Sequence, residues 1–117
     1  MPAWRACELV GRARIEADAA TADGLALKKI RPGDRAIYRG LAFEEETSFS
    51  ICLKADGMCR VEVYADDGYW GCLTARASEA YATYSAVLLP LHGIREISLR
   101  FYGDFESAAI EAFHFSK

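Results

Sequence analysis

The chain has 117 residues, a formal net charge of −3 at pH 7 and 52% apolar residues. This length and composition are typical of one domain with a single hydrophobic core, so we expect residues 1–117 to form one domain. The mildly acidic charge, without a run of lysines and arginines, argues against a nucleic-acid partner. The apolar runs are far shorter than a bilayer is thick, which argues against a membrane partner.

The N-terminal stretch MPAWRACELVGRAR has charges inside every short apolar segment, which is not the pattern of a secretory signal. Cysteines at positions 7, 52, 59 and 72 form no Cys-x-x-Cys pair, and the sequence has only two histidines, which argues against a zinc site. A bridge between Cys52 and Cys59 is one interpretation, and four small buried thiols is the other. Unpaired thiols would suit a reducing cytoplasm.

The first half of the chain contains one irregular segment and one clear strand. Residues 15–22 (IEADAATA) are rich in alanine but have no apolar stripe, and Asp-Gly at 23–24 ends the segment, so we expect an irregular loop. Residues 48–54 (SFSICLK) alternate between apolar and polar side chains, which predicts a half-buried strand. Its core face would carry Phe49, Ile51 and Leu53.

The second half contains three more alternating stretches, at 59–64 (CRVEVY), 94–102 (IREISLRFY) and 108–115 (AAIEAFHF). In the last of them, alternation places Ile110, Ala112 and His114 on one face and Glu111, Phe113 and Phe115 on the other. Turn sequences rich in Gly and Asp separate the strands at intervals typical of an antiparallel sandwich. We therefore predict an all-β domain of two antiparallel sheets packed face to face.

Residues with catalytic chemistry are sparse. The sequence has no Gly-x-Ser-x-Gly elbow and no glycine-rich phosphate loop, and its acidic pairs lie in polar, turn-like runs. We therefore expect that the chain is not an enzyme. Several aromatic residues lie in turns or on faces that alternate with the core, namely Tyr64, Tyr69, Trp70, Tyr81, Tyr84, Tyr102 and Phe105. Such rings can stack on the C–H face of a sugar, and the alternative is that they pack in the core or in hairpins.

Motifs along most of the chain suggest a family. GDRAIYRGLAF at 33–43 is followed by VEVYADDGYWGCL at 61–73, ASEAYATYSAVL at 77–88, HGIREISLRFYG at 92–103 and AIEAFHF at 109–115. In this order and spacing the sequence resembles the carbohydrate-binding modules of family 6. The resemblance implies a jelly-roll sandwich of the galactose-binding-like type. It also implies non-catalytic binding of a plant or algal polysaccharide or oligosaccharide, with xylan favoured, in a module attached to a glycoside hydrolase.

The resemblance also implies where the sugar would bind. Glu16 matches the family's glutamate and Tyr81 one of its two stacking aromatics, with Tyr84 as a structural ring three places on. Lys29 stands where the second aromatic is expected, and Ala109 stands near the position of the expected asparagine. Phe105 and Glu106, in the loop before the last strand, are candidates to compensate for these departures.

Two further features follow from the resemblance. Glu8 and Glu111 match ligands of a structural calcium, although Ala6 replaces another oxygen ligand, and the alternative is two surface carboxylates. Tyr69 and Trp70 would line a second site at a sheet edge or pack against a catalytic module.

The sequence is compatible with two alternatives, one for function and one for location. One alternative to sugar binding is an accessory sandwich that has lost its sugar site and packs on a catalytic module. The family implies an extracellular location as part of a secreted enzyme, and the cysteines leave the cytoplasm as the alternative.

Overall fold

The computed structural model describes residues 1–6, 8–22 and 24–117, which are almost entirely β-structure. The elements are η1 (Ala3–Arg5), β1 (Glu8–Val10), β2 (Arg14–Ala17), β3 (Leu25–Ile30), β4 (Arg35–Ala55), β5 (Met58–Ala65), β6 (Gly68–Ala75), β7 (Ala82–Asp104) and β8 (Ala108–Ser116). Within these residues, no helix has the length and hydropathy needed to cross a membrane.

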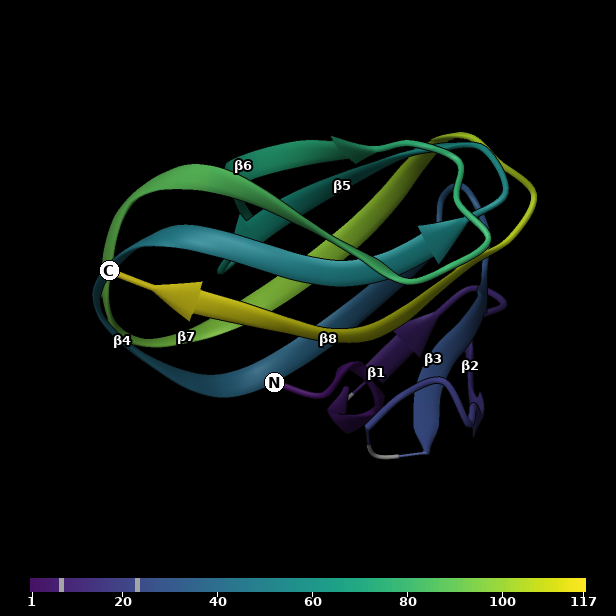
Figure 1. Cartoon of the computed structure of the whole chain (residues 1–117). Coiled ribbons are helices and arrows are strands. Elements are labelled where there is room, and N and C mark those ends of the chain that lie inside the picture. Colours follow the sequence, from purple (N-terminus) through teal and green to yellow (C-terminus); the bar gives the residue numbers. More distant parts are fainter. Residues whose placement is uncertain (7, 23) are drawn as a thin grey trace.

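Two long strands, β4 and β7, connect the layers of the molecule (Figure 1). Residues 48–55 of β4 and 82–87 of β7 belong to one antiparallel sheet, in the order β2-β3-β8-β4-β7. Residues 35–46 of β4 and 91–104 of β7 belong to the other, in the order β1-β4-β7-β5-β6. The predicted two-sheet antiparallel sandwich is confirmed.

Irregular residues allow β4 and β7 to pass from one sheet to the other. The register between the two strands shifts between Glu44 and Glu46 and again between Glu46 and Ser48. Glu45 has a φ of 66°, which is the left-handed conformation typical of an extra residue in a bulge. These shifts bend the paired strands at the end of the sandwich where the C-terminus lies (Figure 1).

The core lies between the sheets, where the alternating strands direct their apolar side chains. Phe49, Ile51 and Leu53 are all fully buried, as the sequence predicts. Rings from both sheets meet near the bend. The Trp70 ring stacks on Phe115 with a centroid distance of 5.4 Å.

Two expectations about local structure are wrong, and strand pairing explains both. Residues 14–17 form β2 rather than part of a loop, because they pair in register with β3. In β8, Cys52 pairs with Ala112 while Leu53 pairs with Ile110, which leaves Glu111 as an extra residue. The bulge reverses the alternation, so Ile110 and Phe113 are both buried although they are three residues apart.

The thiols described by the structure are unpaired. Cys52, Cys59 and Cys72 are free cysteines, so the bridge between Cys52 and Cys59 is not formed. Cys7 lies outside the described residues. Burial raises the pKa of the Cys59 thiol to about 12, as expected of an inert core cysteine.

We predict that Gly103→Ala destabilises the domain more than Gly24→Ala. Gly103 has a φ of 128°, and a Cβ there would lie 2.3 Å from the carbonyl oxygen of Met58. Gly24 has a φ of 72° but open space around a Cβ, so it serves as the control for backbone conformation alone. We expect a loss of about 1–2 kcal/mol at Gly24 and at least about 3 kcal/mol at Gly103, measured by urea unfolding. Equal losses would show that the close approach has no cost.

Candidate functional site

A groove of about 810 Å³ lies at the end of the sandwich opposite the bend. Strands β2 and β3 form one side of it, and the end of β4, the loop before β7 and the start of β8 form the rest. Its lining residues are Glu16, Lys28, Lys29, Lys54, Ala55, Asp56, Ala77, Ser78, Glu79, Ser107, Ala108 and Ala109. All of them are charged, hydroxyl-bearing or alanine, so the lining offers hydrogen-bonding groups and no aromatic ring.

A bulge in β3 places two lysines in this lining. Leu27 pairs with Ile110 and Ile30 pairs with Ala108, so β3 has one residue more than β8 over this interval. Lys29 has a φ of 60°, in the left-handed region, and marks the bulge. Because of the extra residue, Leu27 and Ile30 are both fully buried while Lys28 and Lys29 face the groove.

The Lys29 ammonium lies 3.0 Å from Oε2 of Glu16, on the neighbouring strand β2. The side chain of Lys29 is 64% exposed and that of Glu16 is 35% exposed. An ion pair this exposed contributes little to folding stability, so either partner can turn toward a ligand at small cost.

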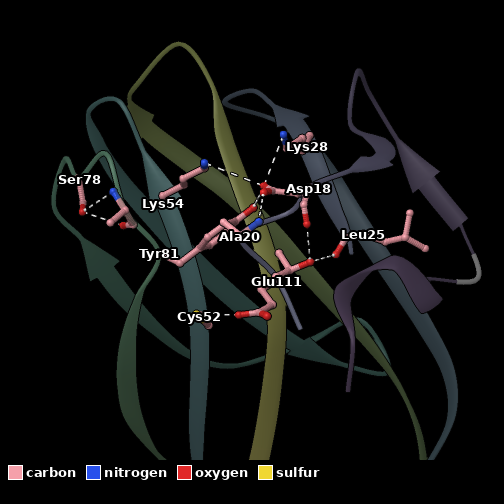
Figure 2. Close-up of polar contacts among 11 residues, drawn as sticks. Asp18, Ala20, Leu25, Lys28, Cys52, Lys54, Ser78, Tyr81 and Glu111 are labelled. Carbon is pink, nitrogen blue, oxygen red and sulfur yellow. Dashed lines mark hydrogen bonds and ion pairs between the residues drawn. The ribbon is translucent and has the colours of Figure 1, made fainter. Parts of the chain in front are cut away.

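A buried carboxylate, that of Asp18, contacts two of the lysines that line the groove (Figure 2). Asp18 is 9% exposed and lies in the turn after β2. Its Oδ2 accepts a hydrogen bond of 2.7 Å from the Tyr81 hydroxyl, and its Oδ1 accepts one of 3.0 Å from the Ala20 N–H. The ammonium groups of Lys28 and Lys54 lie 3.4 and 4.0 Å from Oδ2. The Tyr81 hydroxyl, followed by the Ala20 N–H, lowers the pKa of Asp18 to about 2.

Tyr81 is held by this carboxylate and partly covered. Burial, and then the hydrogen bond to Asp18, raise the pKa of the Tyr81 phenol. The Lys54 ammonium lies 4.7 Å from the centroid of the Tyr81 ring, a cation–π contact that occupies one face (Figure 2). A sugar could stack on that face only after the Lys54 side chain moves.

The structure brings together three of the positions that the sequence assigned to a sugar site. Glu16, Lys29 and Ala109 line the same groove, although they come from β2, β3 and β8. Tyr81 lies beside them, behind Lys54. Tyr84 packs partly buried against the core, in keeping with its expected structural role.

The two proposed compensating residues do not lie in the groove lining. Phe105 is 7% exposed and belongs to the hydrophobic core, so the expectation that its ring could replace a missing platform is wrong. Glu106 is exposed, and its backbone N–H donates to Oδ1 of Asp56. The groove carboxylates that sequence reasoning missed are Asp56 and Glu79, and the missed cations are Lys28 and Lys54. Asp18 was also missed, because its burial depends on the β2–β3 pairing that the sequence did not predict.

The aromatic pair on the β5–β6 hairpin separates into two environments. The Trp70 ring is packed against Phe115, and its Nε1–H donates to the Leu89 carbonyl at 2.7 Å. Tyr69 is 57% exposed and lies edge-on to Tyr64, with a centroid distance of 5.7 Å. Of the two, only Tyr69 presents a largely open ring for a second site or an interface.

The two carboxylates expected to bind calcium have protein partners. Oε1 of Glu8 lies 2.9 Å from the Arg39 guanidinium. Oε2 of Glu111 accepts the Ala22 N–H at 2.8 Å, and its Oε1 lies 3.5 Å from the Cys52 thiol. In the described parts of the chain, no group of three or more acidic, histidine or cysteine side chains could hold a metal ion. The calcium site therefore stays a prediction.

Solved structures match this chain, whereas a scan of protein-family models and a search of curated proteins find no match. A family 6 carbohydrate-binding module from Clostridium cellulolyticum, in complex with xylose, has a TM-score of 0.88 at 17% identity, over 99% of this chain and 95% of its own. A β-1,3-glucan-binding family 6 module from Bacillus halodurans has a TM-score of 0.85 at 20% identity, over 100% of this chain and 94% of its own. The chain therefore has the fold of the family 6 modules, as the sequence resemblance implies.

Two other matches are informative about context. A family 43 arabinoxylan arabinofuranohydrolase from Bacillus subtilis, in complex with cellotetraose, has a TM-score of 0.79 at 16% identity, over 94% of this chain and 27% of its own. The module CBM36, in complex with calcium and xylotriose, has a TM-score of 0.74 at 16% identity, over 99% of this chain and 98% of its own. At these identities the likeness establishes the fold alone.

We predict that Asp18→Asn makes the acid dependence of stability shallower. An unfolded aspartate has a pKa near 3.9, and the folded value is about 2, so the charge of Asp18 stabilises the folded state above about pH 4. This contribution is lost as the pH falls from about 4 to about 2. The free energy of unfolding of wild type should fall more steeply than that of Asp18→Asn over this interval, measured by urea titration with near-UV circular dichroism. The exposed control Asp104→Asn should keep the wild-type slope, and identical slopes for wild type and Asp18→Asn would contradict the assignment.

Proposed function

We propose that this chain binds a polysaccharide or oligosaccharide, without catalysis, in the groove formed by β2, β3 and the loops around them. One observation carries the proposal: Glu16, Lys29 and Ala109, the positions that the family resemblance assigns to sugar binding, line a single groove. The groove lies on a fold shared with sugar-binding modules that were solved with their ligands.

Hydrogen bonds would be the main source of affinity. Glu16 can accept from sugar hydroxyls, Lys29 can donate to them, and Ser78 and Ser107 can do both. Stacking on Tyr81 would add to these bonds after Lys54 has left the ring face. Because no aromatic residue is in the lining, we expect modest affinity, with much of the gain offset by desolvation of charged groups.

We propose a xylan-type chain as the preferred glycan, with a β-1,3-glucan as the competing one, since the similar modules include both a xylose complex and a β-1,3-glucan binder. The match within an arabinoxylan arabinofuranohydrolase supports a module that is attached to a glycoside hydrolase and works outside the cell. In that setting the module would hold the attached enzyme near its insoluble substrate.

We predict that Glu16→Ala/Lys29→Ala weakens binding of the best ligand by at least about tenfold, because each substitution removes a charged hydrogen-bonding group from the groove. Titration calorimetry with xylo-, cello-, arabino- and laminari-oligosaccharides, each with calcium and with a chelator, would measure this. The double substitution removes one acid and one base, so the net charge stays constant.

Tyr69→Ala is the control, because this exposed ring lies on the β5–β6 hairpin and outside the groove lining. It should bind as wild type does. Loss of binding in Tyr69→Ala with retention in the double variant would place the site on the hairpin instead. A calcium dependence of affinity or melting temperature would support the predicted metal site.

A second candidate function is packing on a catalytic module. Val87, Leu89 and Ile94 on β7 are 89%, 77% and 75% exposed, an unusual set of apolar side chains for one strand of a small domain. If no oligosaccharide gives heat in the titrations and the attached hydrolase loses thermal stability when these three residues are changed to serine, packing is the function.

A further inference from the structure

Three exposed arginines gather beside the groove. Arg12 lies in the turn between β1 and β2, Arg14 begins β2, and Arg31 follows the last residue of β3. The two turns are fixed to each other by the Asp34 side chain. Its Oδ2 accepts hydrogen bonds from the backbone N–H of Arg12 at 3.2 Å and the backbone N–H of Arg31 at 3.0 Å. Asp34 is buried, so this anchor fixes where the backbone presents the two exposed arginine side chains. We call Arg12, Arg14 and Arg31 the arginine patch.

The arginine patch has positive charge that the protein does not compensate. In the described part of the chain, no carboxylate lies within 4.0 Å of any of these three guanidinium groups. Some arginines elsewhere differ: Arg60 and Arg95 lie 2.9 and 3.0 Å from the carboxylates of Glu62 and Asp66. Arg35 and Arg76 resemble the patch in having no such ion pair among the described residues, but they lie apart from each other in the sequence. Uncompensated cations thus concentrate at one place in a chain whose net charge is −3.

The patch continues the basic side of the groove. Arg14 and Glu16 are two residues apart on β2 and so share a face, and Glu16 lines the groove. The Cα partner of Arg14 is Lys28, and directly paired residues direct their side chains to the same side of a sheet. Lys28 also lines the groove, so the arginine patch adjoins the lysines of β3 through Arg14. Along β2 and β3 the two lysines outnumber Glu16, whereas on the other side of the groove Asp56 and Glu79 outnumber Lys54, so the net positive charge lies on the side of β2 and β3.

We infer that the ligand is an acidic glycan, whose carboxylate or sulfate groups bind the arginine patch while a neighbouring sugar unit occupies the groove. Arginine binds carboxylates and sulfates through paired N–H donors, so uncompensated guanidinium groups suit an anionic substituent. This inference rests on the proposed function of the groove and specifies its ligand class.

The test compares matched glycans and matched variants. The glycans are glucuronoxylan and its carboxyl-reduced form, and a sulfated galactan and its desulfated form; polyglutamate is the non-glycan polyanion. The patch variant is Arg12→Gln/Arg14→Gln/Arg31→Gln. The control variant, Arg60→Gln/Arg95→Gln/Lys117→Gln, loses the same number of positive charges from β5, β7 and the C-terminus, outside the groove lining. Near-UV circular dichroism checks that both variants fold.

We expect wild type to bind at least one acidic glycan about tenfold or more tightly than its neutral counterpart, since several arginines contribute. The patch variant should lose this preference, the control variant should keep it, and added salt should reduce it. Tighter binding of glucuronoxylan than of its carboxyl-reduced form indicates that the patch binds a carboxylate. Tighter binding of the sulfated galactan than of its desulfated form indicates that it binds a sulfate.

Other outcomes would overturn the inference. If wild type binds each acidic glycan and its neutral counterpart with equal affinity, the acidic-glycan inference is wrong, while sugar binding in the groove still holds. An equal loss in both triple variants would show a general effect of net charge. Binding of polyglutamate with the same dependence on the patch would indicate an acidic protein partner. If no glycan of either kind binds, the proposed function fails, and this inference fails with it.

Discussion

The pairing of β4 with β7 determines how the two sheets of this domain sit against each other. Both strands run through both sheets, so their hydrogen bonds hold the two layers in one register and close one end of the sandwich. The bend of the two paired strands lies at that closed end. There Trp70 stacks on Phe115, and Phe43 packs edge to face against both rings. The opposite end is left to the loops, and it is there that the groove forms.

Two single-residue bulges give the groove its chemistry. The bulge at Lys29 turns two lysines out of β3, and the bulge at Glu111 lets a carboxylate accept the N–H of Ala22 in the β2–β3 turn. Asp18, in the same turn, accepts a hydrogen bond from the Tyr81 hydroxyl and lies near the Lys54 ammonium. The Lys54 ammonium in turn lies over the Tyr81 ring. Charged contacts therefore occupy the place where an aromatic platform would be open. This favours a ligand with polar or acidic substituents over one that binds by stacking alone.

Alternation of side chains was enough to predict the sandwich, because an uninterrupted strand with one buried face leaves a regular pattern, as Phe49, Ile51 and Leu53 show. It failed where one extra residue reverses the faces, as in β8 at Glu111, since a bulge leaves no mark in a single sequence. The positions of Glu16 and Lys29 could be predicted from the family resemblance. The arginine patch could not, because Asp34 brings the backbone of Arg12 and Arg31 together in the folded chain and leaves no pattern in the sequence.

We propose that the glycan binds in the groove between β2, β3 and the surrounding loops. The most direct test is a two-dimensional amide NMR titration of the ¹⁵N-labelled domain with the tightest-binding oligosaccharide. We expect the largest shift changes at Glu16, Lys28, Lys29, Ser78 and Ser107, in the strands and loops that line the groove. Shift changes centred on Tyr64, Tyr69 and Tyr102, in β5, β6 and β7 of the other sheet, with the groove residues unmoved, would show that the glycan does not bind in the groove.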